Sequence, residues 1–275
     1  MSVPENAGAE NTQSDGIAAR TQLDGTDPWE QMRPLTQARI GLQRSGNTVS
    51  TRDVLRFQAD HAAARDAVHT PMDSASVING LRGLGLGEPM LVTSQASSRA
   101  EYLRRPDLGR LPADLSTITH SGADVGFVVA DGLSATAVDT HVVSLIGTIA
   151  AELGSTYTLA PPVVATQARV ALGDHIGEAL GVEILLVIIG ERPGLSVADS
   201  LGIYLTYRPE AGRRDSERNC ISNIHPPDGL GYHDAARIVT ALVGGARALG
   251  ASGVALKDTS SADTSVSASD TKELM

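Results

Sequence analysis

The sequence predicts an α/β fold, in which a helical N-terminal region is followed by a Rossmann-like parallel-sheet domain. The strongest observation is the unbroken apolar run at residues 184–189, because strands covered on both faces of a parallel sheet are apolar throughout. The second is an alternation of strand and helix patterns from Asp124 onward, which is typical of parallel sheets covered by helices. The third is a helical pattern that begins near Thr51, ahead of these strands.

Composition divides the chain into four segments. Residues 1–27 and 258–275 are rich in Ser, Thr and acidic side chains and show no helical or strand period, so we expect a disordered leader and a disordered tail. Between them we expect a mainly helical N-terminal region at residues 28–115 and an α/β domain at residues 116–257.

The N-terminal region is expected to contain one clear helix capped by Thr51. Its apolar face is formed by Leu55, Ala59, Ala62, Ala63 and Ala67. Residues 72–111 are expected to form short helices and turns. The glycine-rich stretch at 83–87 follows no strand and lacks dinucleotide spacing, so we interpret it as a turn and not as a phosphate loop.

The α/β domain is expected to alternate between strands and helices. Strands are predicted at residues 125–129, 163–165, 184–189 and 203–207. Helices are predicted at residues 134–149, with Ser134 as the N-cap, and at 174–180 and 235–249.

Charge and residue usage exclude several classes of function. The formal net charge is −10, but the two tails carry −7 of it, so the body offers no basic surface and we expect no nucleic-acid partner. The two lysines, Lys257 and Lys272, lie at or beyond the end of the folded region, which excludes a Schiff-base, pyridoxal-phosphate or P-loop lysine. Seven histidines without ligand spacing and a single cysteine give no metal motif and no intramolecular disulfide.

No apolar run approaches the roughly 20 residues of a membrane helix, and the N-terminus lacks a signal-peptide pattern. We therefore expect a soluble, cytoplasmic protein without a membrane partner.

Glu191 and Arg192 are the first candidate site residues, because they directly follow the apolar run. Ligands of doubly wound α/β folds bind just past the carboxyl ends of the strands. The alternative is a tight surface turn, closed by Pro193 and Gly194, in which Glu191 and Arg192 form an ion pair.

Six strings in order along the chain resemble the small subunit of ethanolamine ammonia-lyase. The two most specific are Gly-Glu-Arg-Pro-Gly-Leu at 190–195 and Cys-Ile-Ser-Asn-Ile-His at 220–225. The other four strings lie at residues 54–61, 102–110, 131–134 and 173–178. The resemblance runs from about Asp27 to Lys257 and leaves only the two tails outside.

The resemblance implies an adenosylcobalamin-dependent lyase that converts ethanolamine to acetaldehyde and ammonia by a radical mechanism. It implies a hetero-oligomer in which a large barrel subunit holds the substrate and this chain covers part of the cobalamin at the interface. Cobalamin-contacting positions transfer onto Val170, Glu191 and Cys220, and no catalytic residue is expected in this chain. Some relatives carry an N-terminal extension that directs the enzyme into a bacterial microcompartment; the leader here shows no clear apolar stripe.

Elementary chemistry fits these roles. Glu191 would accept hydrogen bonds from corrin amides or ribose hydroxyls, and Arg192 would suit the nucleotide phosphate if it faced inward. Cys220 would act as a small buried hydrophobe in van der Waals contact, and not as a nucleophile. Asn223 and His225 offer further polar groups nearby.

His141 belongs to an incomplete version of the Asp-x-His-x-x-Gly motif of other cobalamin domains. Ser144 replaces the glycine and the segment follows a helical pattern, so we interpret His141 as a histidine on the surface of a helix.

Two other classes stay open at this point. A nucleotide-binding α/β oxidoreductase fits the alternation of strands and helices, but the chain lacks a Gly-x-Gly-x-x-Gly turn after its first strand. A non-catalytic scaffold protein fits the lack of acid–base and metal clusters.

Overall fold

The computed structural model describes residue 27 and residues 29–258. The predicted leader and tail therefore lie outside the described residues, except for one residue of each. Residues up to Ser50 and residues from Thr51 onward form two separate compact units.

The first unit is small and is held by polar contacts. It contains the short 3-10 helix η1 (Arg33–Leu35) and a hairpin of β1 (Arg44–Ser45) and β2 (Thr48–Val49). The Arg33 guanidinium lies 2.6 Å from the Asp27 carboxylate and donates to the Gly41 carbonyl oxygen. None of the described residues up to Ser50 is buried, so an apolar core does not hold this unit together.

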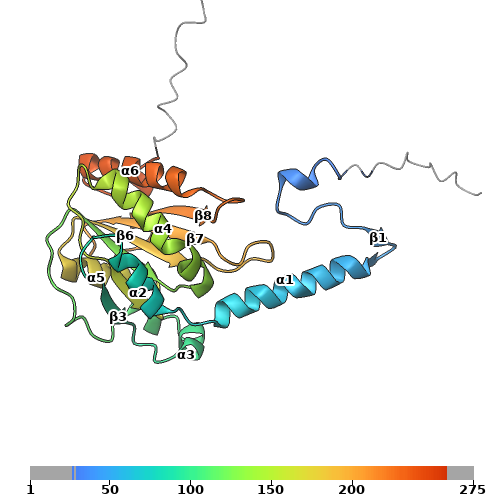
Figure 1. Cartoon of the computed structure of the whole chain (residues 1–275), viewed down its shortest axis with the longest axis horizontal. Coiled ribbons are helices and arrows are strands. Elements are labelled where there is room, and N and C mark those ends of the chain that lie inside the picture. The colour runs from blue at the N-terminus through green and yellow to red at the C-terminus, as the bar shows by residue number, and fades with distance from the viewer. Residues whose placement is uncertain (1–26, 28, 259–275) are drawn as a thin grey trace, which may run out of the picture. The chain divides into compact units, whose positions relative to one another are not determined.

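A six-stranded mixed sheet forms the centre of the second unit (Figure 1). In spatial order its strands are β3 (Met90–Thr93), β5 (Val163–Thr166), β4 (Val125–Ala130), β6 (Ile184–Gly190), β7 (Leu201–Tyr207) and β8 (Arg218–Ile224). The first four pair in parallel, whereas β7 is antiparallel to both of its neighbours.

Helices cover both faces of this sheet. The helices of the second unit are α1 (Thr51–His69), α2 (Ser74–Arg82), α3 (Arg99–Arg104), α4 (Ala135–Leu153), α5 (Leu172–Leu180) and α6 (Tyr232–Leu249). Short 3-10 turns are η2 (Leu108–Arg110), η3 (Asp215–Glu217) and η4 (Gly253–Ala255). Apolar side chains of α2, α4 and α6 pack on one face, and those of α5 pack on the other. Helices α4 and α6 lie side by side in Figure 1. No helix in the described part of the chain is long and apolar enough to cross a membrane.

Strands β4 and β6 are buried at every position, which explains their unbroken apolar sequence. Each full burial of a Val, Leu or Ile side chain contributes about 1.5–3 kcal/mol, so this pair anchors the sheet. The segments that follow β4 and β6 therefore start from fixed positions.

Most predicted elements of the α/β domain are confirmed within a few residues. All four predicted strands and all three predicted helices are present, and the Ser134 side chain caps α4 by accepting from the Ala137 amide at 3.2 Å. The mixed α/β class is confirmed, whereas the Rossmann-like description and the domain boundaries stay predictions. The stretch at 83–87 forms a turn after α2, as expected.

Three expectations need correction. The sheet is not wholly parallel, because β7 turns back beside β6. The segment 72–111 contributes an edge strand, β3, as well as short helices. Of the predicted apolar face of α1, Ala67 alone is buried and Leu55 is 59% exposed.

His141 is also placed differently from the prediction. It lies within helix α4, as expected, but its side chain is buried because Tyr232 of α6 and Asp199 of the β6–β7 connection lie against it. The interpretation as a surface histidine was wrong, because the sequence pattern of one helix does not reveal which neighbour covers its polar face.

Candidate functional site

The candidate site lies at the carboxyl ends of β4, β5 and β6, and it extends onto the neighbouring strands β7 and β8. Asp131 directly follows β4, Val170 lies between β5 and α5, and Glu191 directly follows β6. Since parallel strands end at one edge of the sheet, these three segments are neighbours.

Glu191 is half-buried and accepts three hydrogen bonds. Its Oε2 accepts from the Ser200 hydroxyl at 2.7 Å and from the Asn223 backbone amide at 3.2 Å, and its Oε1 accepts from the Ser222 hydroxyl at 2.5 Å. Ser200 directly precedes β7, whereas Ser222 and Asn223 belong to β8. The partners are two hydroxyls and an amide, not Arg192, whose side chain is exposed. The geometry of Glu191 is therefore that of a held acceptor and not that of a Glu–Arg surface turn.

A glycine gives the Glu191 carboxylate its space. A Cβ atom at Gly202 would lie 3.0 Å from Glu191 Oε1 and 3.3 Å from Cγ, tighter than ordinary van der Waals contact. Gly202 pairs with Ile189 across β6 and β7, so the carboxylate lies over the first residues of β7. A larger residue here would force the Glu191 carboxylate to shift.

Cys220 is exposed, so it is not buried within the chain itself, and its predicted van der Waals contact with a cofactor stays a prediction. It pairs with Tyr204 across β7 and β8, and the two side chains interact. Desolvation raises the pKa of the Cys220 thiol, the Tyr204 hydroxyl lowers it, and the charge of Glu191 raises it further. Burial, together with Cys220 and the Glu191 charge, raises the pKa of Tyr204 to about 12. Both groups are therefore neutral near pH 7, and the thiol is a poor nucleophile.

The loop that carries Val170 is held by a buried carboxylate. The Asp131 oxygens accept from the backbone amides of Gln167 at 2.9 Å and Ala168 at 2.8 Å. Arg99 donates to Asp131 at 3.2 Å, and the Tyr102 hydroxyl donates to the Ala168 carbonyl at 3.0 Å. Burial raises the pKa of Asp131, whereas the bonds from the backbone amides and the charge of Arg99 oppose the rise.

Tyr102 also contacts two guanidinium groups. Those of Arg99 and Arg169 lie 5.0 Å and 4.5 Å from its ring centroid, within the range of cation–π attraction. Each of the two arginines has one buried guanidinium nitrogen without a hydrogen-bond partner in the described part of the chain. The Gln167 Oε1 atom is also buried there without a partner. Gln167 itself adopts a φ of 54°, which is uncommon for a residue with a side chain. Unpaired polar atoms and a strained residue are thus gathered at the Val170 loop.

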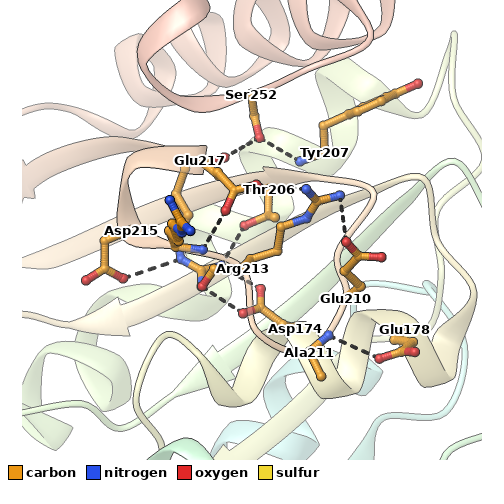
Figure 2. Close-up of polar contacts among 12 residues, drawn as sticks. Asp174, Glu178, Thr206, Tyr207, Glu210, Ala211, Arg213, Asp215, Glu217 and Ser252 are labelled. Atoms are coloured by element: carbon orange, nitrogen blue, oxygen red, sulfur yellow. Dashed lines mark hydrogen bonds and ion pairs between the residues drawn. The ribbon is translucent and has the colours of Figure 1, made fainter.

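A buried ion pair fixes β8 relative to α5. Arg218, two residues before Cys220, donates to both Asp174 oxygens at 2.5 and 2.7 Å, and both side chains are 1% exposed. Arg218 also donates to the Thr206 hydroxyl and to the Arg213 carbonyl oxygen. Figure 2 shows Asp174, Thr206 and Arg213 gathered in one network. Asp174 lies four residues after Val170, so this pair links the Val170 segment to the Cys220 strand.

The three predicted contact residues fall on one face of the sheet. Val170 and Tyr204 both pack against the apolar cluster between α5 and the sheet. Cys220 and Glu191 in turn lie next to Tyr204. Asn223 supplies a backbone donor to Glu191, with a φ of 64°. His225 is buried and its Nε2 lies 2.9 Å from Asn223 Oδ1, so it supports Asn223 instead of facing this surface.

Sequence reasoning missed several residues that build the site. Ser222 could have been predicted from the sequence. It lies two residues after Cys220, and alternate side chains of a strand lie on the same face. Ser200 and Arg99 lie in none of the strings that carry the resemblance, and their roles follow only from the tertiary contacts. In the described residues no group of three or more His, Cys, Asp and Glu side chains is placed to hold a metal ion.

A family comparison decides what kind of protein carries this site. The model of the ethanolamine ammonia-lyase light chain (EutC) matches residues 26–257, which contain every site residue described above. The chain belongs to this family.

Similar proteins agree with the family. An ethanolamine ammonia-lyase small subunit from Rhodococcus erythropolis is 59% identical over 237 residues, covering 86% of this chain and 92% of the relative. Small subunits from Ralstonia nicotianae and Azotobacter vinelandii are 45% and 46% identical over 241 residues, each covering 84% of this chain and 88% of the relative. The light-chain family implies a lyase complex in which a large subunit is the partner.

Proposed function

We propose that this chain is the cobalamin-covering subunit of an adenosylcobalamin-dependent ethanolamine ammonia-lyase. In this proposal a large barrel subunit holds ethanolamine, and the present chain contacts the cofactor through Val170, Glu191 and Cys220 at the interface. The observation that carries the proposal is that Glu191 and Cys220, two of the three contacts implied by the family, flank Tyr204 on one exposed part of the sheet.

The donor and acceptor groups of this surface suit a corrin with its amide side chains. Glu191 is held as an acceptor and Cys220 is exposed and neutral, so the surface combines one charged acceptor with a small apolar contact. One buried guanidinium nitrogen of Arg99 and one of Arg169 lack hydrogen-bond partners within the described residues. Donors for a ligand are therefore also present near the Val170 loop. These features support binding of a large ligand with both apolar and hydrogen-bonding parts.

The residues of this chain bind and orient, and none is assigned a chemical step. Glu191 would accept from amide or hydroxyl donors of the cofactor, because its own donors leave the carboxylate with further lone pairs. Cys220 would pack against the ligand, since a neutral thiol is a weak donor and a small apolar group. Bound adenosylcobalamin supplies the radical that starts removal of ammonia from ethanolamine.

The proposal places the enzyme in the cytoplasm, with a bacterial microcompartment as a second location in organisms that make one. Family membership favours this complex over an independent oxidoreductase, which rested on the general α/β alternation, and over a non-catalytic scaffold, which rested on the lack of acid–base and metal clusters.

Co-expression with the large subunit of the same organism tests the proposal. We expect the two chains to co-purify and to retain adenosylcobalamin, visible in its absorption spectrum, after removal of free cofactor. A stable two-chain complex in which substitution of Glu191, Cys220 and Val170 together leaves cofactor retention unchanged would contradict the proposed site.

A further inference from the structure

His141 is a buried polar residue that the proposed contacts with the cofactor do not use. Its side chain is 8% exposed and lies between two elements that are distant in the sequence. Nδ1 lies 2.7 Å from the Tyr232 hydroxyl of α6, and Nε2 lies 3.5 Å from Asp199 Oδ2 in the segment that joins β6 to β7.

The neighbours of His141 favour one tautomer. If Nε2 carried a lone pair, it would face the Asp199 carboxylate, and two acceptors would repel each other. If Nε2 carries the proton, its partial positive charge lies 3.5 Å from the Asp199 carboxylate, an electrostatic contact longer than a hydrogen bond, and the Tyr232 hydroxyl donates to Nδ1. Asp199, His141 and Tyr232 then form one chain of complementary groups.

Asp199 belongs to a short segment that holds Glu191. The next residue, Ser200, donates its hydroxyl to Glu191 Oε2 at 2.7 Å, and its carbonyl oxygen accepts from the Glu191 amide at 3.0 Å. The preceding residue, Ala198, accepts from the Ser134 hydroxyl at 2.7 Å. Helix α4 therefore contacts residues 198–200 at two points, the cap residue Ser134 and the buried His141.

We propose that His141 is the positioning residue that fixes residues 198–200 and thereby orients the Glu191 carboxylate. It acts through Asp199 and touches neither Glu191 nor a ligand. The orientation of the carboxylate is a property of this chain alone, whereas its consequence for cobalamin binding rests on the proposed function.

Hydrogen exchange of the full chain without cofactor tests the structural part. The Asn223 amide donates to Glu191 Oε2 at 3.2 Å, so its exchange rate reports on the carboxylate, and the Glu191 amide reports on the bond to Ser200. In His141→Leu we expect both amides to exchange about five-fold faster, the effect of losing one hydrogen bond of about 1 kcal/mol. His233→Leu is the matched control, because His233 is exposed and adjacent to Tyr232, and we expect no change.

Two further variants separate positioning from general destabilisation. Asp199→Ala removes the acceptor from a side chain that is 45% exposed, so it should fold normally and give the same faster exchange. His141→Gln retains an N–H donor and should restore part of the protection. Unchanged exchange at both amides in Asp199→Ala, or an equal rise across strands β4 and β6, would overturn the proposal.

Cobalamin titration of the assembled enzyme then tests the consequence. We expect Asp199→Ala to weaken adenosylcobalamin binding several-fold in the wild-type background and to have no added effect in the Glu191→Gln background. Additive losses in the double variant would overturn the route through Glu191. If Glu191→Gln itself leaves binding unchanged, the proposed cofactor contact fails, while the exchange result still decides the positioning role.

Discussion

At the scale of single residues, Glu191 is oriented before any ligand arrives. Its three donors come from β8 and from the residue before β7, so the protein and not the ligand sets the direction of the carboxylate. Preorganisation of this kind reduces the entropy lost on binding. Substitutions of Glu191 should therefore change ligand affinity more than they change the fold.

Glu191→Gln should weaken adenosylcobalamin binding about ten-fold or more. The neutral side chain loses a charge-assisted bond of roughly 1.5–3 kcal/mol and introduces an unwanted donor. The Ser200 and Ser222 hydroxyls can rotate to accept, so assembly should survive. Equilibrium titration of the complex measures the effect, and half-saturation for ethanolamine should shift less. An unchanged cofactor affinity would return Glu191 to a structural role.

Cys220→Ser should reduce cofactor affinity only modestly, by about five-fold, because a packing contact of about 1 kcal/mol is lost. The hydroxyl still fits beside Tyr204, so turnover should continue at saturating cofactor. Steady-state kinetics over a range of adenosylcobalamin concentrations would measure this. Complete inactivation of an intact, cofactor-loaded complex would show that the thiol has a chemical role.

The raised pKa of Cys220 predicts slow alkylation of the thiol at neutral pH. Desolvation and the Glu191 charge favour the protonated form, and the reactive thiolate is populated only as the pH rises above the ordinary thiol range. The chain has a single cysteine, so mass spectrometry after iodoacetamide treatment reports this site alone. Glu191→Gln should speed alkylation by removing the negative charge. A rate at pH 7 above that of a model peptide would refute the prediction.

At the scale of elements, the Asp174–Arg218 pair joins α5 to β8. Asp174→Ala should lower the free energy of unfolding by about 3–5 kcal/mol, because Arg218 is left charged and buried. Urea unfolding gives the value, and Asp174→Leu combined with Arg218→Met should recover part of the loss. Glu88→Ala in the exposed Arg82–Glu88 pair is the control and should change stability little. A small effect of Asp174→Ala would mean that water reaches the pair.

The sequence predicted those helices and strands whose burial can be inferred from their own residues, without knowledge of their neighbours. Strand β6 is apolar at every position and α4 begins with a capping serine, so both were found. Strand β8 was not, because its side chains alternate irregularly between buried and exposed and its buried Arg218 looks like a surface residue in the sequence. Helix α1 carries a helical pattern, but its exposure depends on neighbours that one segment does not encode.

At the scale of the whole molecule, the site depends on the antiparallel edge of a mostly parallel sheet. An alternating pattern predicts parallel strands, yet the donors to Glu191 are present only because β7 returns beside β6 and brings β8 with it. The family resemblance named Val170, Glu191 and Cys220 as contacts. Their support by Asp131, Asp174 and Ser200 required the folded arrangement, because these partners are distant in sequence.

The isolated chain should show no ethanolamine deamination, even with adenosylcobalamin added. None of the site residues forms an acid–base or nucleophile cluster, and the thiol and the Tyr204 hydroxyl are neutral near pH 7. Acetaldehyde formation should appear when the large subunit is mixed in. Turnover by the purified chain alone, with contaminating large subunit excluded by mass spectrometry, would contradict the prediction.

Gly202 leaves space for the Glu191 carboxylate because it has no side chain. It neither binds nor reacts, yet a methyl group there would press on the carboxylate that Ser222 holds in place. In a saturation scan scored by cofactor retention, position 202 should therefore be as intolerant as position 191. Measuring the protein abundance of Gly202→Ala should separate ligand binding from folding, because a small shift of the half-buried Glu191 carboxylate should cost the fold little. If the surface binds a corrin as proposed, a redesign for a different ligand should keep glycine at position 202 before it adds a new contact.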